Sequence, residues 1–486
     1  MTATVQDRMA SAREAIARMR VPQPKGIARP PGPPAMKSMI ALMTGRTPPY
    51  LFFQGISDNY QPVGYVHMAR EHIYVLSSPE LIWEAFVSQG RNMYKGRGVQ
   101  LTRALLGNGL LASEGAQHLR NRRLVQPAFH RQAIAGYATD MVNSTKDLSD
   151  RWRQLTQSGN HEIDVVQEMS GVTLDIVGRS LFGADLTGDA TQVAESLNVM
   201  LNGFNRISGP MIPALTRIPT PKRKRMIAAI DTLDNVVDGL IAKKHVEIAE
   251  GTAGHDVASL LLQTVDEETG ATLSDQEVRD ETMTMVLAGH ETTAMTLSWT
   301  LRDLTMNPAQ MAWLREELDA LPDRDLTMTD ARDLPRAYAI VAESIRLHPP
   351  AWFIGRFAAA DLELGGWQIP QGSVLGISQY AMHRDARFWS QPLDFVPSRW
   401  LKDGVFDEKA PGQPRGSWFP FGFGTRRCIG EQFAWLEAVL VLATLLRQWN
   451  IEVTDPEAVV PMSAITMRPR DGMTAKITRR DYSPPV

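Results

Sequence analysis

The sequence predicts a mainly α-helical protein with a small β portion, an α+β fold. Apolar residues recur with helical spacing through most of residues 113–335, and one of the helices there is very long. After Pro350 the chain changes to short strand patterns separated by turn residues. The helical and strand-rich segments are interleaved, which favours a single domain over residues 38–486. Residues 1–37 are expected to form an N-terminal arm with a proline-rich connector.

The composition is that of an ordinary globular protein. Of the 486 residues, 43% are hydrophobic and 22% charged, which excludes a disordered, collagen-like or coiled-coil chain. The 51 basic and 54 acidic residues give a net charge of −3, so no nucleic-acid partner is expected. No run approaches the about 20 apolar residues that cross a bilayer, so we expect no transmembrane anchor and a cytoplasmic location. The single cysteine excludes an intramolecular disulfide and a cysteine-ligated iron–sulfur cluster.

The first elements after the arm are short. Prolines over residues 22–34 forbid a helix and favour an extended connector. Residues 63–69 and 72–76 are predicted strands. Residues 78–80, Ser-Pro-Glu, supply a cap, a first-turn proline and an acidic residue, so a helix is predicted to begin there.

One helix is long enough to pass through most of a domain. Ser274 and Glu277 have the spacing of a capping box, and the helical pattern continues to Asn307, just before a proline. Its roughly 33 residues would measure about 50 Å. Residues 288–293 break the pattern near its middle.

Prolines and turn residues delimit the remaining elements. Breaks in the helical region are expected at residues 208–210 and 218–221. A further helix begins near Pro335 and ends before Pro349. Residues 361–370 are predicted to form a hairpin.

The strongest signal for function is residues 421–430, Phe-Gly-Phe-Gly-Thr-Arg-Arg-Cys-Ile-Gly. Alternating glycines let the backbone turn sharply and approach a flat group closely. An apolar helix follows Gly430, so Cys428 would lie just before a helix N-terminus, where the thiolate is favoured over the thiol. With Arg426 two residues before it, Cys428 is equipped as an axial haem ligand. A lone cysteine without this pattern would more commonly be a buried structural residue.

At this point the sequence resembles the cytochrome P-450 family of haem-thiolate monooxygenases, of the soluble bacterial type. The resemblance implies a triangular, helix-rich prism with haem b between the long central helix and the cysteine loop. It also implies that Cys428 is the ligand of the haem iron. The loop matches the family signature at Phe421, Gly422, Gly424, Arg426, Cys428 and Gly430, and of these Phe421, Gly422, Arg426 and Gly430 would also contact the cofactor.

The same resemblance implies residues that bind the haem propionates. In the family a helix that corresponds to residues 114–123 usually carries Trp and Arg four residues apart. Here His118 replaces the Trp and Arg122 matches the Arg. Histidine can still donate a hydrogen bond to a carboxylate. Arg356 and Arg426 resemble two further propionate-binding arginines.

The break in the long helix resembles the segment at which the family activates dioxygen. Ala288 and Gly289 would border the haem, and Gly289 would leave room for dioxygen. Thr292 can donate to an upstream carbonyl and open the helix locally, while Glu291 would supply protons. Taken alone, the segment would be interpreted as a kinked core helix. His290 is left out of the chemistry, because this position varies in the family pattern.

The resemblance also implies a structural network on the cysteine side of the haem. Glu343 and Arg346 lie three residues apart on one helix face, and Arg399 would join them. Without the resemblance, the first two residues would be interpreted as a solvated ion pair.

Substrate-facing segments are chiefly apolar. By resemblance they include residues 99–106, 200–212, 352–354 and 465–467. These favour a hydrophobic small molecule such as a terpenoid, a fatty acid or a polyketide-type metabolite. The residues expected in this pocket are Leu105, Leu287, Trp352, Phe353 and Thr466.

The implied activity is insertion of one oxygen atom from O2 into an unactivated C–H or C=C bond. No flavin, nicotinamide or iron–sulfur motif follows the cysteine loop, so a separate ferredoxin or flavodoxin and an NAD(P)H-dependent reductase are expected to supply electrons. Arg120, Arg123 and Arg427 would form a basic patch for such an acidic partner. Two alternatives stay open: a haem-thiolate peroxygenase or isomerase, and a non-catalytic haem sensor.

Overall fold

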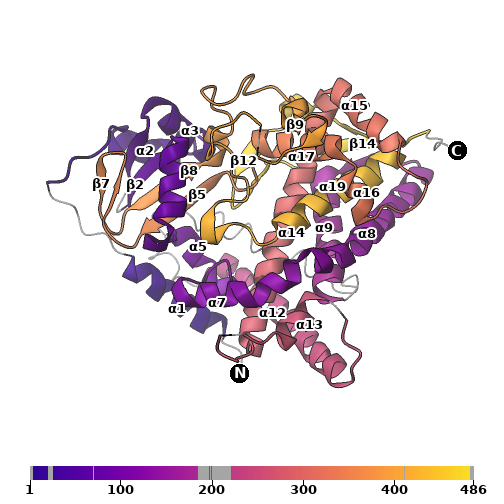
Figure 1. Cartoon of the computed structure of the whole chain (residues 1–486), viewed down its shortest axis with the longest axis horizontal. Coiled ribbons are helices and arrows are strands. Elements are labelled where there is room, and N and C mark those ends of the chain that lie inside the picture. Colours follow the sequence, from indigo (N-terminus) through magenta and orange to yellow (C-terminus); the bar gives the residue numbers. More distant parts are fainter. Residues whose placement is uncertain are drawn as a thin grey trace.

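A computed structural model describes residues 4–19, 26–68, 71–183, 196, 199, 220–254, 256–266, 268–409 and 411–481. Helices form most of the molecule, and the largest sheet lies at one side with α2 and α3 (Figure 1). The predicted α+β composition is confirmed. No helix of the described residues is long and apolar enough to cross a membrane.

The helices and strands follow the order expected for a helix-rich body with interleaved strands. The α-helices are α1 (Val5–Arg18), α2 (Ala35–Met43), α3 (Pro49–Asn59), α4 (Pro79–Trp83), α5 (Arg97–Leu101), α6 (Arg103–Leu106), α7 (Gly115–Val125), α8 (Arg131–Gln157), α9 (Val165–Phe182), α12 (Pro221–Ala249), α13 (Val257–Gln263), α14 (Asp275–Met306), α15 (Pro308–Asp319), α16 (Met328–Arg332), α17 (Pro335–Leu347), α18 (Gln379–Met382) and α19 (Glu431–Gln448). The strands are β1 (Val63–Met68), β2 (Glu71–Leu76), β3 (Met93–Lys95), β4 (Glu162–Asp164), β5 (Phe353–Ala358), β6 (Leu362–Leu364), β7 (Trp367–Ile369), β8 (Val374–Ser378), β9 (Leu401–Lys402), β10 (Val405–Phe406), β11 (Trp449–Val453), β12 (Pro461–Ser463), β13 (Met467–Pro469) and β14 (Thr474–Arg479).

Capping and turn residues in the sequence predicted several boundaries of helices and strands correctly. Ser274 caps α14 and forms the predicted capping box with Glu277. Ser78 caps α4, and β6 and β7 form the predicted hairpin. The predicted break at residues 208–210 lies outside the described residues. The one at 218–221 is described from residue 220 on, and α12 begins at Pro221.

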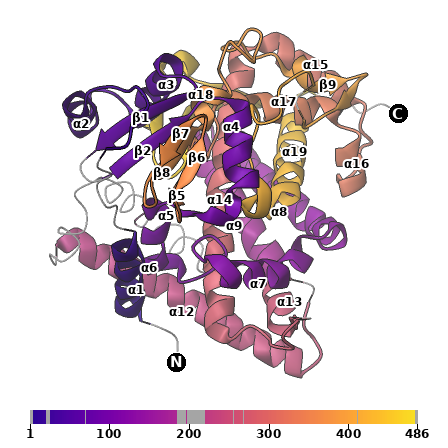
Figure 2. The same ribbon diagram turned by 60° about the vertical axis from the view of Figure 1, so that its left-hand side comes forward.

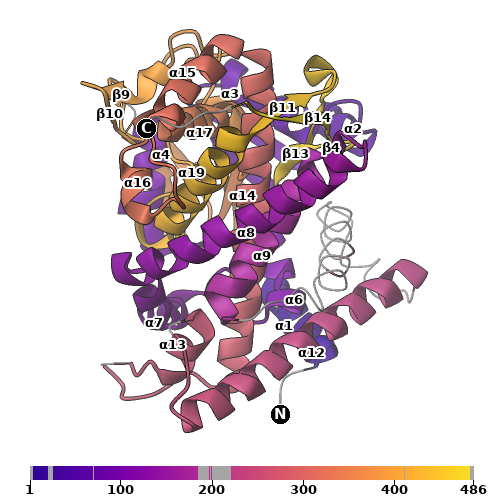
Figure 3. The same ribbon diagram turned by 90° about the vertical axis from the view of Figure 1, so that its right-hand side faces the viewer.

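The long helix α14 is the centre of the helical body. It packs against α9, α12, α17, α19 and β11, and Figure 3 shows α9 and α19 next to it, with α8 packed on both. Most of its residues are buried from Val278 to Leu304. A helix buried along this length offers fixed positions for side chains deep in the molecule.

The largest sheet has the strand order β1-β2-β8-β5-β3, in which β2 and β8 are parallel and the other pairs antiparallel. Its two faces carry separate apolar clusters. One face packs on α3 through Phe53, and the other packs on Phe86 and Phe419. A second sheet, β11-β14-β4, lies beside α8 and α14.

The N-terminal arm is packed on the rest of the chain. Helix α1 contacts α5, α6 and α12. Arg8, which is buried, forms an ion pair with Asp234 on α12. Asp234 also pairs with Arg279 on α14, so charged side chains connect the arm to the central helix.

Candidate active site

The cysteine loop contains two glycines in the left-handed region. Gly422 has a φ of +73° and Gly424 a φ of +62°. A Cβ atom on Gly424 would lie 3.0 Å from the carbonyl oxygen of Phe86. The N–H of Cys428 donates to the Phe421 carbonyl at 2.8 Å, which closes the loop shortly before α19. The sharp turn predicted from the glycines is present.

The Cys428 thiol is accessible and yet desolvated. Its side chain is exposed, but the surrounding protein raises the pKa of the thiol to about 11, against weaker lowering by the N–H of Gly430 and by Arg122. A side chain with both properties faces a hollow within the protein rather than bulk solvent. The predicted preference for thiolate is wrong for the ligand-free chain, because desolvation outweighs the helix N-terminus. A bound metal ion reverses this balance, since it deprotonates a coordinating thiol.

The middle of α14 also borders open space. Ala288 is exposed and Thr292 partly exposed, although Leu287, His290 and Thr293 are buried. The Thr292 hydroxyl donates to the Ala288 carbonyl at 2.8 Å, as expected. The helix is continuous here, so the predicted local opening is absent.

Gly289 allows close helix packing. A Cβ atom at this position would lie 3.2 Å from Cγ2 of Val177 on α9. The missing side chain therefore eases packing against α9, and its predicted role in leaving room for dioxygen stays a prediction. Ala288 is the residue of this pair that is exposed.

The carboxylate of Glu291 is held away from the threonine beside it. It is buried and accepts a hydrogen bond from Thr466 at 2.8 Å, in the segment between β12 and β13. Arg468 on β13 lies 3.8 Å from the same oxygen. Successive helix residues point about 100° apart, so the acid and the alcohol face different neighbours.

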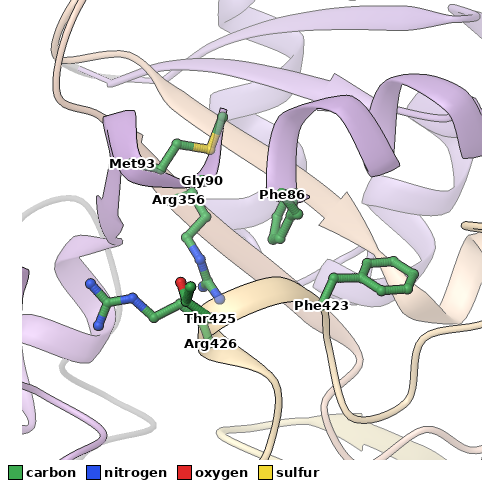
Figure 4. Close-up of a pocket in the computed structure, with 7 residues that line it drawn as sticks. All are labelled: Phe86, Gly90, Met93, Arg356, Phe423, Thr425 and Arg426. Atoms are coloured by element: carbon green, nitrogen blue, oxygen red, sulfur yellow. The ribbon is translucent and has the colours of Figure 1, made fainter. Parts of the chain in front are cut away.

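A small pocket beside the cysteine loop is positively charged. Figure 4 shows Arg356 extending from β5 toward the loop with Thr425 and Arg426, and Phe86 and Phe423 nearby. The Arg356 guanidinium lies 5.2 Å from the centre of the Phe86 ring. Burial and repulsion by Arg426 lower the pKa of Arg356 to about 10.

Lys95, at the end of β3, joins this cluster and was not predicted from the sequence. Its Nζ donates to the carbonyls of Leu110 and Ser113 at 2.6 and 2.9 Å. Burial, with repulsion from Arg426, lowers the pKa of Lys95. The only sequence signal was a lysine in a short strand-like segment, which many surface strands share.

His118 and Arg122 on α7 both contact the cysteine loop. The two ring nitrogens of His118 lie 3.3 Å from the Leu110 carbonyl and 3.4 Å from that of Thr425. Burial lowers the pKa of His118 to about 3, so the ring is neutral and donates only one of these bonds. Arg122 donates to the Arg427 carbonyl at 2.8 Å, one residue from the cysteine.

The donor set fits haem. Arg356 and Arg426 are cations at least partly buried together, and Glu114 is the carboxylate that pairs with Arg426. Lys95 lies beside them with its pKa lowered to about 6. An excess of desolvated cations is stabilised by an anionic ligand, and haem carries two carboxylates. The accessible thiol of Cys428 supplies a soft ligand for iron.

The three residues of the expected network are in contact. Glu343 is fully buried and accepts from Arg346 at 2.9 Å, from Arg399 at 3.1 Å and from Trp400 at 2.9 Å. The N–H of Val396 donates to it at 2.8 Å. The interpretation as a solvated ion pair is excluded, because Glu343 and Arg346 have no accessible surface.

Replacing Glu343 with glutamine should lower the free energy of unfolding by about 3–5 kcal/mol, because the buried Arg346 then lacks a counter-charge. Chemical denaturation of both proteins measures this difference. Glu457→Gln, at an exposed position, is the matched control and should change stability little. A loss below about 1 kcal/mol in Glu343→Gln would contradict the importance of the network.

The predicted basic patch is neutralised. Arg120 pairs with Glu277 at 2.5 Å, and Arg427 with Glu431 at 2.5 Å. Arg123 lies 2.9 Å from Glu268. The three arginines therefore present little unbalanced positive charge, contrary to the prediction.

The residues predicted to line the substrate pocket are mostly buried, and their role stays a prediction. Leu105 has no accessible surface, and Leu287 and Thr466 are almost as buried. Phe353 packs 4.3 Å from Phe53 on α3, on the face of the sheet opposite to Phe86. Trp352 belongs to the same α3 cluster, and its indole N–H donates to the Ala464 carbonyl. Neighbouring strand residues alternate between faces, so Ile354 shares the face of Arg356.

The fold and the site together define a haem-thiolate protein, and comparisons with known proteins identify its family. The cytochrome P450 family model matches residues 30–475. Cyclooctatin synthase from Streptomyces melanosporofaciens is 35% identical over 83% of this chain and 84% of its own length. Pentalenene oxygenase from Streptomyces avermitilis is 33% identical over 84% of this chain and 88% of its own. The crystal structure of the cytochrome P450DA heme domain has a similar fold, with a TM-score of 0.81, 24% identity and coverage of 93% of this chain and 98% of that chain.

This chain belongs to the cytochrome P450 family. It is a monooxygenase of bacterial type, and its cofactor is haem with a cysteine thiolate as axial ligand. The predicted fold, enzyme class and cofactor are confirmed.

Proposed function

We propose that this monooxygenase inserts one oxygen atom from O2 into a C–H or C=C bond of a terpenoid. The names of three relatives support this substrate class: cyclooctatin synthase, cyclooctat-9-en-7-ol 5-monooxygenase and pentalenene oxygenase. A fatty acid or a polyketide-type metabolite is the alternative. The observation that carries the proposal is that Cys428 and the middle of α14 are accessible although they lie deep in the fold.

In this proposal Cys428 holds the iron, and it is the only cysteine of the chain. Arg356, Arg426 and Lys95 hold the two propionates, with His118 and Arg122 supporting the loop beneath. Bound haem supplies the iron at which dioxygen is reduced. Substrate bound in the hollow would displace water from it.

Proton supply is assigned to α14. Thr292 is partly exposed, and its hydroxyl can accept from a water in the hollow, or donate to a ligand there once it releases the Ala288 carbonyl. Glu291 is an acid one residue away, held by Thr466 and near Arg468. For Glu291 to pass a proton inward, its carboxyl group has to leave Thr466 or act through water.

Electrons are proposed to come from a separate ferredoxin or flavodoxin with an NAD(P)H-dependent reductase, in the cytoplasm. The ion pairs of three surface arginines change how the electron-donor protein is expected to dock. Because Arg120, Arg123 and Arg427 are already paired with carboxylates, electrostatic attraction of an acidic partner has to rely on other residues or remain weak.

Ligand binding and isotope labelling test this function. Terpene hydrocarbons and alcohols should shift the Soret band from the low-spin to the high-spin position, because they displace water from the iron, whereas fatty acids of similar size should not. With ¹⁸O2 the product should contain one labelled oxygen. A shift with fatty acids alone would refute the terpenoid class, and label-free product in the presence of peroxide would favour a peroxygenase.

A further inference from the structure

Helix α2 exposes apolar side chains on its outer face, although Ala41 and Leu42 of the same helix pack against the core. Met36, Met39 and Ile40 are 62%, 36% and 48% exposed, and their spacing places them on one side of the helix. Ser38, by contrast, is only 1% exposed and donates to the Pro34 carbonyl. A surface helix of a globular protein normally shows the reverse arrangement.

The adjoining helix α3 continues this feature. Leu51 is 41% exposed, while Phe52 and Phe53 on the same helix are buried. Helices α2 and α3 pack against each other, and Figure 2 shows α2 at the outer edge of the molecule. We call the exposed side chains of Met36, Met39, Ile40 and Leu51 the α2–α3 patch.

The segment that carries this patch is basic as far as Asp58, an exposed carboxylate near the end of α3. Residues 21–57 contain four basic residues and no acidic residue, although the whole chain has a net charge of −3. Lys37 and Arg46 are exposed, and among the described residues no carboxylate lies within ion-pair distance of either. Arg120 and Arg427, in contrast, are each paired with a carboxylate.

We propose that the α2–α3 patch docks on an anionic lipid surface. Apolar side chains on one helix face enter the boundary between headgroups and acyl chains, and flanking cations meet the phosphates. A second copy of the chain fits less well, because a two-fold contact would place Lys37 and Arg46 against their own symmetry mates. An acidic, apolar protein surface is the other alternative, and the test separates it.

A series of contacts connects α3 to the middle of α14. Tyr50, next to Leu51, packs 4.8 Å from Tyr380, and both contact Met467. The neighbouring Thr466 bonds to Glu291. Lipid docking would bring α3 close to molecules dissolved in the membrane. The docking itself does not depend on the proposed function.

Vesicle sedimentation of the haem-loaded, full-length protein tests the proposal. The protein should sediment with vesicles of phosphatidylglycerol and phosphatidylcholine, and much less with phosphatidylcholine alone. Raising the salt concentration should weaken the binding, because counter-ions screen the lipid charge. Absence of binding to the anionic vesicles, or equal binding to both kinds, would overturn the proposal.

Variants separate the contribution of the cations to lipid binding from that of the apolar side chains. Lys37→Glu/Arg46→Glu should lower the partition coefficient by about 30-fold or more, since each cation near an anionic surface contributes about 1 kcal/mol. Met39→Ser/Ile40→Ser should lower it by about tenfold. Lys402→Glu and Val405→Ser, both exposed in another part of the chain, are matched controls and should bind as the parent does.

Two outcomes would contradict docking at this surface. One is vesicle binding that the patch variants leave unchanged. The other is a dimer in sedimentation velocity that Met39→Ser/Ile40→Ser dissociates while the parent ignores vesicles, since the patch would then join two copies. If this protein bound a protein partner through the patch and showed no affinity for anionic vesicles, the proposed lipid ligand would likewise be wrong.

Discussion

Replacement of Cys428 with alanine should abolish the red-shifted Soret band of the reduced carbon monoxide complex. That band reports thiolate ligation of iron, and no other cysteine in the sequence can replace this one. Cys428→His should instead move the band to the position typical of imidazole ligation. Absorption spectra of the reduced, carbon monoxide-treated proteins measure both results, and the expected effect is complete loss.

A control in the same loop guards against misfolding. Ile429→Val is a volume-reducing change beside the thiol and should keep the band. Haem retained by Cys428→Ala through the propionate-binding cations would still be consistent with the proposal, provided that the thiolate band is gone. An unchanged band in Cys428→Ala would refute the assignment of the axial ligand.

Thr292→Ala should uncouple the reaction without changing the Cys428 spectrum. The hydroxyl is partly exposed at the middle of α14, and no backbone group can take over its donor role there. We expect reductant consumption to continue while hydrogen peroxide rises and oxidised product falls. Glu291→Gln should slow turnover itself, because the acid is lost while the hydroxyl remains. Each loss should be on the order of 10²-fold at most, since water partly substitutes.

The neighbouring threonine supplies an internal control. Thr293 is buried beside Glu437, whose pKa burial raises to about 8, so its hydroxyl cannot reach the hollow. The double variant Thr292→Ala/Thr293→Ala should therefore be no less coupled than Thr292→Ala alone. The measurement is product formed per reductant oxidised, and full coupling in Thr292→Ala would show that protons arrive by another route.

Much of the fold was predictable because it depends on local interactions. The capping box at Ser274 and the cap at Ser78 act within one helical turn. The glycines of the cysteine loop require positive φ values, and the sequence places them there regardless of distant residues. The residues of the Glu343 network were also identified from the sequence, although only through the resemblance to a family.

Other features of the site depend on contacts between residues that are far apart in the sequence, which the sequence pattern does not predict. Thr466 reaches Glu291 across 175 residues, and Arg426 reaches Glu114 across 312. Gly289 is explained by Val177 on another helix, and Lys95 becomes part of the cation cluster only because β3 pairs with β5.

Sequence alone therefore determined the helix-rich fold, the cysteine loop and the types of residue that hold haem. The tertiary structure decided which faces those residues turn to the hollow, which arginines are paired with carboxylates, and the direction in which the pKa of Cys428 shifts. The physical reason is the distance along the chain over which each kind of interaction acts. Dihedral preferences and caps act between neighbours along the chain, whereas desolvation and charge pairing depend on every segment that the fold brings near.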